Sequence, residues 1–223
     1  MSPVAATWIA VLLAYAIGSI PFGFLIARFV RGIDIRQHGS GNIGATNVGR
    51  VLGPRWGILA LVLDFIKALL PTCLLPQLLV GIPAWNNHVA IACGVAAIVG
   101  HMYPCWLWLR GGKGVASALG VVAYLAPVST AIAFGVFVVT VLAWRIISVS
   151  SMSAALAFAM AHILLNRDHL WTDSGWSLTV FSLAIPLLII ARHRSNLVRL
   201  WKGEEPTFQT SRERKQAETA AVH

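Results

Sequence analysis

The residues best suited to chemistry lie in a glycine-rich segment, residues 39–47, which reads GSGNIGATN. Its glycines allow successive backbone N–H groups to turn toward one point, which is how a chain forms an anion-binding nest. Serine, asparagine and threonine side chains add donors, and the guanidinium of Arg50 can bind a phosphate bidentately. A plain turn needs only a few residues, so this length and donor density favour a phosphate site. The candidates in this segment are Gly39, Ser40, Gly41, Asn42, Gly44, Thr46, Asn47 and Arg50.

A second glycine-rich segment, residues 110–114, reads RGGKG. It is not a Walker A motif, because the spacing differs and a glycine replaces the serine or threonine that would bind magnesium. What remains is a flexible turn with a lysine at the start of an expected helix, and a helix N-terminus suits an anion. The alternative is a membrane-interface turn whose bases reach toward water. Together with the first segment, the anion site is favoured, and its candidates are Gly111, Gly112, Lys113 and Gly114.

Two further clusters are weaker on their own. Residues 192–199 read RHRSNLVR, and in a helix His193 and Asn196 would share a face, with Arg192 close to it. A basic cluster that only sets membrane orientation is the simpler interpretation from sequence alone. Ser148 follows Arg145 at an expected helix end, where a polar helix terminus is again the simpler interpretation. These residues become site candidates only in combination with the two glycine-rich segments.

Asp64 and Lys67 are ionisable residues inside an otherwise apolar stretch. A charge at that depth costs about 2.5–3.5 kcal/mol on insertion scales. We therefore expect them to pair with each other or with a polar cavity. His101 and Cys105 are too few to make a metal site, so we expect no metal and no cofactor.

Composition restricts the class of protein that positions these residues. The chain has 223 residues, of which 57% are hydrophobic and 11% charged, whereas a soluble domain is about 25% charged. A soluble globule and a disordered chain are both excluded. The three cysteines fit neither a disulfide framework nor a zinc site. The net charge of +9 suggests membrane topology and an anionic partner such as a lipid headgroup or a phosphorylated substrate; we expect no nucleic-acid partner.

Uncharged runs predict an all-α integral membrane protein with about seven transmembrane helices, some of them short or re-entrant. Basic residues concentrate in residues 28–55, in residues 110–113 and after residue 191, which predicts an outside N-terminus and a cytoplasmic C-terminus. This orientation requires the run 114–144 to cross twice, divided at Pro127. Residues 1–202 form one membrane domain, and residues 203–223 a flexible polar cytoplasmic tail without a site. The predicted spans are 3–27, 56–80, 88–109, 115–126, 128–144, 151–166 and 175–191.

These residues together carry a family resemblance. The string GSIP at 18–21, followed by Asp34-x-Arg36 and GSGNIGATN, resembles the first signature of the bacterial acyl-phosphate-dependent glycerol-3-phosphate acyltransferases. GHMYP at 100–104 with GGKGVAS is similar to their second signature, and RHRSN with Arg199 and Gly203 to their third. The match covers about residues 15 to 205. One departure is Ala68, where the family usually has glycine.

The resemblance implies a seven-helix enzyme of the bacterial cytoplasmic (inner) membrane that acts as a monomer without cofactor. It would transfer a fatty acyl group from acyl phosphate to the 1-hydroxyl of sn-glycerol 3-phosphate. The products would be lysophosphatidic acid and phosphate, in the first acylation of phospholipid synthesis. Both substrates carry a phosphate, so a basic, glycine-rich pocket that opens to membrane lipid fits them.

Residue roles follow from the same resemblance. The segment 39–47 would bind the donor phosphate. Lys113 and its glycines, with Arg50 and Ser148, would hold glycerol 3-phosphate. His193 and Asn196 would orient the attacking hydroxyl or polarise the carbonyl, and either His193 or a substrate phosphate would take the proton. The expected catalytic residues are Ser40, Arg50, Lys113, His193 and Asn196, and the expected phosphate-binding residues also include Ser148 and Arg192.

Two other functions are compatible with a polytopic protein. A transporter of phosphorylated solutes would show repeated halves and a binding site near the middle of the membrane, but the chain shows no convincing repeat and its polar clusters are expected on one side. A non-catalytic scaffold leaves three clusters of hydrogen-bond donors on that side without a purpose.

Overall fold

The computed structural model describes residues 2–80 and 87–207, and every regular element in this part of the chain is helical. This confirms the all-α prediction. The α-helices are α1 (Pro3–Gly18), α2 (Phe22–Arg31), α3 (Ala45–Leu52), α4 (Pro54–Leu75), α5 (Asn87–Met102), α6 (Val115–Leu125), α7 (Pro127–Trp144), α8 (Ile147–Leu165), α9 (Trp176–Arg192) and α10 (Arg194–Trp201). The shorter helical turns are η1 (Ile35–Gln37), η2 (Pro76–Val80), η3 (Cys105–Leu107) and η4 (Arg167–His169).

Prolines and glycines set the helix boundaries. Pro3 occupies the first turn of α1, behind the hydroxyl of Ser2, which accepts a hydrogen bond from the backbone N–H of Ala5. Pro54 and Pro127 likewise open α4 and α7. Proline suits this position because the first N–H groups of a helix have no intrahelical acceptor. Pro127 therefore divides the run 114–144 into α6 and α7, as the sequence predicts.

In the described residues, five helical segments are long and apolar enough to span a membrane: Pro3–Arg31, Pro54–Leu79, His88–Leu107, Pro127–Trp144 and Ile147–Leu165. A sixth candidate pairs α9 with α10, which bend by 57° relative to each other. Helix α6 is apolar but shorter. With α6, these segments correspond to the seven predicted crossings.

The first predicted span, 3–27, is not one continuous helix. Helix α1 ends at Gly18, and α2 begins at Phe22 and continues to Arg31. The interruption arises at Pro21, because proline has no N–H and restricts the residue before it. Helix α8 begins at Ile147 rather than residue 151, so Ser148 and its neighbouring serines lie in its first turns.

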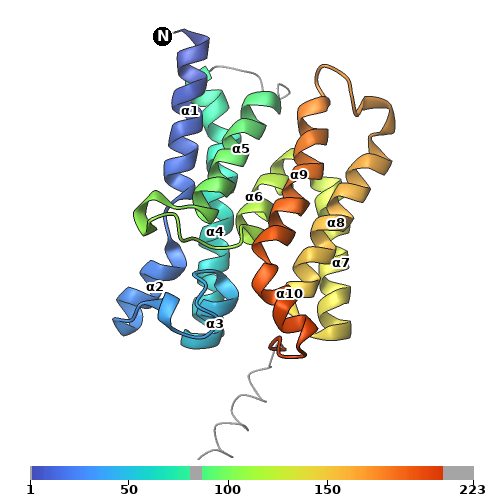
Figure 1. Ribbon diagram of the computed structural model, residues 1–223. Coiled ribbons are helices and arrows are strands. Elements are labelled where there is room, and N and C mark those ends of the chain that lie inside the picture. Colours follow the sequence, from blue (N-terminus) through green and yellow to red (C-terminus); the bar gives the residue numbers. More distant parts are fainter. Residues whose placement is uncertain (1, 81–86, 208–223) are drawn as a thin grey trace, which may run out of the picture.

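The long helices form two groups (Figure 1). Helices α1, α4 and α5 pack together, and α7 packs on α8, which packs on α9. Helix α6 contacts α4, α5, α7 and α9, and thereby joins the groups. Buried Ile98, Val121 and Phe181 belong to the core shared by both groups. Leu12, Leu142 and Leu187 are instead exposed on the outside, as a lipid-facing surface requires.

The short helices α2, α3 and α10 gather at one end of the bundle, which we call the site end (Figure 1). Helix α3 packs against α4 and α2, and its buried Val48 and Leu52 join Ile26 and Ile35 in a second core. This packing holds the segment between α2 and α3 against the long helices, so the first glycine-rich segment has a fixed position.

Candidate active site

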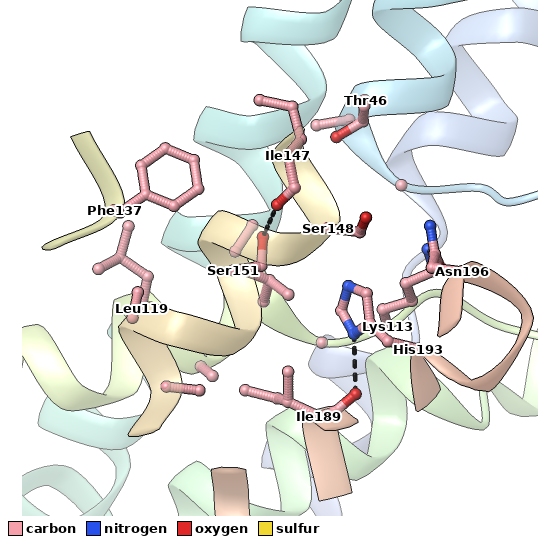
Figure 2. A pocket seen from close by; sticks show the side chains of 18 of the residues that line it. Thr46, Lys113, Leu119, Phe137, Ile147, Ser148, Ser151, Ile189, His193 and Asn196 are labelled. Carbon is pink, nitrogen blue, oxygen red and sulfur yellow. Dashed lines mark hydrogen bonds between the residues drawn. The ribbon is translucent and has the colours of Figure 1, made fainter. Parts of the chain in front are cut away.

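A cavity of about 310 Å³ lies between α6 and the group α7, α8 and α9. Its deep part is apolar, with Val122, Ala133, Phe158 and Ile185 in its wall. Its other part, at the site end, is lined by side chains from all three predicted polar clusters (Figure 2). The polar lining residues there are Ser40, Asn42, Thr46, Asn47, Arg50, Lys113, Ser148, His193, Asn196, Arg199 and Glu205.

Asn47 organises the first glycine-rich segment from within. Its Oδ1 atom accepts the backbone N–H of Ser40 (2.8 Å), and its Nδ2 atom donates to the carbonyls of His38 (3.0 Å) and Asn42 (2.8 Å). The side chain is buried. These bonds fold residues 38–42 around one amide, so Asn47 holds the shape of the segment, whereas the sequence suggested direct phosphate binding.

The glycines of this segment have distinct tasks. Gly39 and Gly41 have φ angles of 60° and 69°, in the left-handed region that favours glycine. Gly44 is the N-cap of α3 and donates its N–H to Oδ1 of Asn42 (2.8 Å). Gly44 and Thr46 line the cavity, whereas Gly39 and Gly41 do not. The segment therefore presents the start of α3 to the cavity, and a helix N-terminus favours an anion.

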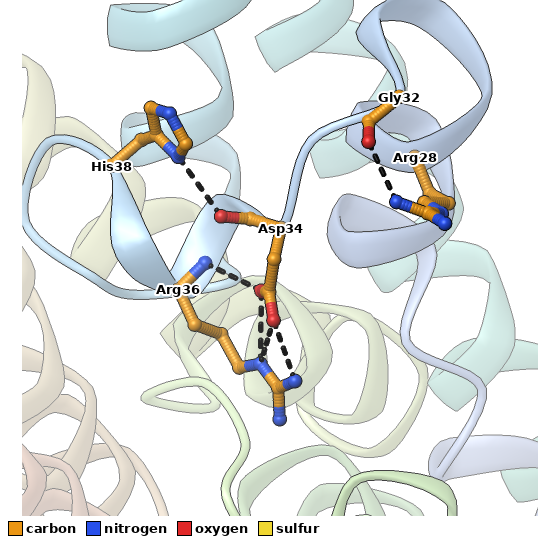
Figure 3. Close-up of polar contacts among 5 residues, drawn as sticks. All are labelled: Arg28, Gly32, Asp34, Arg36 and His38. Atoms are coloured by element: carbon orange, nitrogen blue, oxygen red, sulfur yellow. Dashed lines mark hydrogen bonds and ion pairs between the residues drawn. The ribbon is translucent and has the colours of Figure 1, made fainter.

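A surface ion pair supports the segment from the chain before it (Figure 3). The guanidinium of Arg36 donates from Nε (3.0 Å) and Nη2 (2.7 Å) to the carboxylate of Asp34, which also accepts the backbone N–H of Arg36. The Arg36 hydrogen bond holds the pKa of Asp34 below its usual value. His38 Nδ1 lies 3.0 Å from the Asp34 carbonyl oxygen. Arg36 thus braces the turn, and it is Arg50 that lines the cavity.

The second glycine-rich segment packs on the end of α5. A Cβ atom on Gly111 would collide with the carbonyl of His101, and one on Gly112 with the His101 ring. Gly112 also donates its N–H to the His101 carbonyl (3.1 Å). Gly114 has φ 81° and is the N-cap of α6. Glycine is needed for this close approach, and it brings Lys113 to the cavity; Gly111 and Gly112 themselves do not line it.

Lys113 reaches across the cavity to the third cluster. Its Nζ atom donates to Oδ1 of Asn196, on α10. Burial lowers the pKa of Lys113 to about 8, and the cations of Arg199, Arg50 and Arg192 act in the same direction, against the carboxylate of Glu205. Burial is the larger cause, and the nearby cations add a positive field that a bound phosphate would neutralise.

His193 lies at the bend between α9 and α10, and its side chain is buried. Its Nδ1 atom lies 2.8 Å from the carbonyl oxygen of Ile189. Since a carbonyl only accepts, Nδ1 carries the hydrogen, and a neutral ring then leaves Nε2 as an acceptor. Figure 2 shows the ring beside Lys113 and Asn196, directed into the cavity. The bend thus leaves Nε2 of His193 as an acceptor beside the cavity.

Glu205 lines the cavity. The prediction that residues 203–223 form a tail without a site is therefore wrong for this residue. Its Oε1 atom accepts hydrogen bonds from Ser148 (2.7 Å) and Asn196 (2.5 Å), and Oε2 accepts one from Arg199 (2.7 Å). Burial alone would raise the pKa of Glu205, but these hydrogen bonds outweigh it and keep the pKa below its usual value. The available signal was a glutamate two residues after Gly203, beside a strongly basic segment.

Asp64 and Lys67 form the buried pair that the sequence predicts. Lys67 Nζ lies 2.7 Å from Asp64 Oδ1, and both side chains are 2% exposed. Lys67 also donates to the carbonyl of Ile20 (2.7 Å), in the break between α1 and α2. His101 Nδ1 lies 3.5 Å from Asp64 Oδ1. Asp64 and His101 line the cavity, so this pair links the cavity wall to the α1–α2 break. No group of side chains suited to a metal ion occurs among residues 2–80 and 87–207.

Comparison with known proteins identifies the family of this chain. The family model described as glycerol-3-phosphate acyltransferase matches residues 8–203. The chain belongs to the glycerol-3-phosphate acyltransferase family. A curated glycerol-3-phosphate acyltransferase from Anaeromyxobacter dehalogenans is 44% identical over 216 residues, covering 92% of this chain and 98% of the relative. One from Desulforudis audaxviator is 42% identical over 200 residues, covering 88% and 92%.

Solved structures of the family have the same fold. The glycerol 3-phosphate form of PlsY (YgiH), an integral membrane glycerol 3-phosphate acyltransferase, is 36% identical, with a TM-score of 0.81. The match covers 92% of this chain and 96% of the PlsY chain. The lysophosphatidic acid form is 35% identical, with a TM-score of 0.78 and the same coverage. This chain is therefore an integral membrane acyltransferase of the PlsY type.

Proposed function

We propose that this acyltransferase takes its acyl group from acyl phosphate and transfers it to the 1-hydroxyl of sn-glycerol 3-phosphate. The observation that carries the proposal is the continuity of the cavity. Amides, hydroxyls and cations line its part at the site end, and an apolar wall lines its deep part. Such a cavity fits a phosphate joined to a fatty chain. The related PlsY structures hold glycerol 3-phosphate and lysophosphatidic acid, which are the acceptor and the product of this reaction.

Acyl phosphate suits this cavity because the donor is already activated. The 1-hydroxyl oxygen attacks the acyl carbonyl carbon, the bond from that carbon to the phosphate oxygen breaks, and inorganic phosphate leaves. The protein must mainly hold two anions side by side and offset their repulsion. Arg50, Lys113 and Arg199 supply positive charge around one cavity. The reaction in this form needs no acyl-enzyme intermediate.

Two sets of residues divide the binding of the two phosphates. The start of α3, with Ser40, Asn42 and Thr46, binds the phosphate of the donor, and Asn47 keeps that segment folded. This assignment rests on the helix N-terminus and on the donors that face the cavity. The second anion, glycerol 3-phosphate, is held by a separate set of residues, namely Lys113, Arg50 and Ser148.

His193 and Asn196 act on the reacting groups. With Nδ1 bonded to the Ile189 carbonyl, Nε2 of His193 is the acceptor that orients the 1-hydroxyl. Asn196 is fixed between Lys113 and Glu205. The hydroxyl proton goes either to Nε2 of His193 or to a substrate phosphate. Replacing His193 by asparagine separates the two routes, because only the first predicts the loss of an ionisation from the pH profile.

The setting is a bacterial cytoplasmic membrane, with the site end facing the cytoplasm and the N-terminus outside. Helices α2, α3 and α10, which carry Arg28, Arg31, Arg50 and Arg199, lie at the site end (Figure 1) and support this orientation. A polar acceptor must also enter from water. We propose that the enzyme acts as a monomer. We place the end of the catalytic domain after Glu205, and residues 208–223 contribute nothing to catalysis.

The test is turnover of the purified protein in lipid nanodiscs. Glycerol 3-phosphate is supplied with palmitoyl phosphate in one arm and with palmitoyl-CoA in the other, and lysophosphatidic acid is quantified. The proposal predicts rapid product formation with palmitoyl phosphate and none with palmitoyl-CoA. Product formed only from the thioester would show that the assigned donor is wrong.

A further inference from the structure

We propose that Arg192 is a positioning residue that holds the Gly111–Lys113 segment in place, and that it does not bind a substrate phosphate. In a helix Arg192 would lie close to the face shared by His193 and Asn196, which is why the sequence predicts it as a phosphate ligand. In the structure, however, it does not line the cavity. The proposal deepens the proposed function, because it explains how Lys113 reaches its working position.

The Arg192 guanidinium is occupied by backbone carbonyls. Its Nε atom donates to the Gly112 carbonyl (3.2 Å). Its Nη2 atom lies within hydrogen-bond distance of the same oxygen (2.9 Å) and of the carbonyls of Gly111 (3.2 Å) and Met102 (3.3 Å). The Cζ atom lies 4.9 Å from the centre of the Tyr103 ring. One cation from α9 therefore joins the end of α5 to the segment that follows it.

This arrangement answers a specific need of the segment. Residues 110–113 form no helix, so their carbonyls lack the partners that a helix would supply. The last carbonyls of α5 have no donor within the helix for the same reason, and Arg192 supplies one to Met102. A guanidinium presents several N–H groups in one rigid plane, whereas an ammonium is a point charge on a flexible stem. Binding three carbonyls and stacking on Tyr103 together fit arginine and not lysine.

Lys113 is thereby fixed at both of its ends. Arg192 binds the carbonyl of Gly112, immediately before Lys113, and Asn196 accepts the hydrogen bond from the Lys113 ammonium. Arg192 and Asn196 lie on either side of the bend at His193. One short stretch of chain thus places the backbone of Lys113, its side chain and the ring of His193 relative to one another. Nε and Nη2 of Arg192 are thus committed to backbone carbonyls and are not available to a phosphate while the segment keeps this position.

The test compares R192K, R192Q and the control R194Q. Arg194 is exposed on the next helix, so its replacement changes the charge of the same region without touching the segment. The first readout is kcat/KM for glycerol 3-phosphate. A positioning role predicts that R192K and R192Q both lose about 10- to 100-fold, the range seen when supporting residues or small displacements disturb a site, while R194Q stays near the wild type.

Hydrogen exchange supplies a readout that does not need turnover. Positioning predicts faster exchange of the backbone amides of residues 110–114 in both R192K and R192Q, with α5 and α9 unchanged. A merely structural role would raise exchange throughout the bundle and lower the melting temperature. Near-wild-type kcat/KM and exchange in R192K, with loss only in R192Q, would overturn the proposal in favour of a charge contact to phosphate. Absence of turnover in the wild type would count against the donor assignment, whereas the exchange comparison would still decide on Arg192.

Discussion

Replacement of Glu205 separates two opposite roles for a carboxylate inside a phosphate-binding cavity. In the structure the Glu205 carboxylate accepts hydrogen bonds from Ser148, Asn196 and Arg199. Either it aligns these hydrogen-bond donors for substrate, or it occupies the place of a phosphate and must leave before substrate binds. The bonded geometry favours alignment, because Asn196 also accepts the hydrogen bond from Lys113.

The magnitude follows from these three contacts. The Glu205 side chain is 7% exposed, and removing one member of a buried charged pair costs about 3–5 kcal/mol. Arg199 is 29% exposed, so water replaces part of its lost interaction. We therefore take the low end, about 3 kcal/mol, as the loss of folding stability in E205A. Loss of a residue that orients site groups costs about 10- to 100-fold in activity, and because Glu205 holds three such groups we expect roughly a 100-fold loss of kcat/KM. E205Q keeps one acceptor oxygen but turns an amide donor toward the Arg199 guanidinium or the Asn196 amide, both of which can only donate. We expect about a tenfold loss of kcat/KM from that single mismatched hydrogen bond.

The assay is kcat/KM for glycerol 3-phosphate in nanodiscs, with thermal unfolding measured in parallel. Two truncations serve as controls. Deletion of residues 208–223 should leave activity unchanged, and deletion from Glu204 onward should match E205A. If E205A instead lowered KM and raised kcat/KM, the carboxylate would be a competitor of phosphate, and the alignment argument would be refuted.

Three other perturbations test separate parts of the site. Burial lowers the pKa of Lys113 to about 8, so the lysine charge is present below that pH and lost above it. As a result, kcat/KM for glycerol 3-phosphate should fall above about pH 8 in the wild type but not in K113R, whose arginine stays charged. A133F fills the deep cavity wall and should shift preference from palmitoyl toward lauroyl phosphate, by about fourfold in kcat/KM per excluded methylene. D64A leaves buried Lys67 without its partner and should lose about 3–5 kcal/mol of stability in thermal unfolding, much of which the double variant D64L/K67L should restore.

Each of these predictions has a contradicting result. A decline at high pH that persists in K113R would assign the ionisation to another group. For chain length, the control V139F places the same ring on the exposed side of α7 and should leave the chain-length preference unchanged. Equal shifts of that preference in A133F and V139F would show that the cavity wall does not set it. Normal thermal stability of D64A would mean that Lys67 finds another partner, such as the Ile20 carbonyl that it already contacts.

Charge positions made the fold predictable to a large extent. Uncharged runs and the break at Pro127 located the long helices, because the membrane excludes charge and proline cannot continue a helix. The break at Pro21 was missed, although proline gave the same signal there. Its neighbours are apolar, so hydropathy alone treated residues 3–27 as one span.

The site was predictable where residue type determines the contact, and less so where backbone geometry does. Lys113 and Asn196 meet in one cavity, as the grouping of the polar clusters predicts. The roles of Asn47 and Arg192 depend on which carbonyls lie nearby, and the sequence does not encode that directly. Glu205 was assigned to the tail because the composition after residue 202 is polar; only the turn after α10 shows that it returns to the cavity.

The central claim is direct acyl transfer from acyl phosphate to glycerol 3-phosphate. Phosphorus NMR tests it most directly, with the purified protein supplied with glycerol 3-phosphate and palmitoyl phosphate. It follows donor, acceptor and both products in one sample. The proposed mechanism predicts that lysophosphatidic acid and inorganic phosphate form in equal amounts from the start, and that omitting glycerol 3-phosphate stops phosphate release. Phosphate released without the acceptor, or an early excess of phosphate equal to the enzyme present, would indicate hydrolysis or an acylated enzyme and would contradict direct transfer.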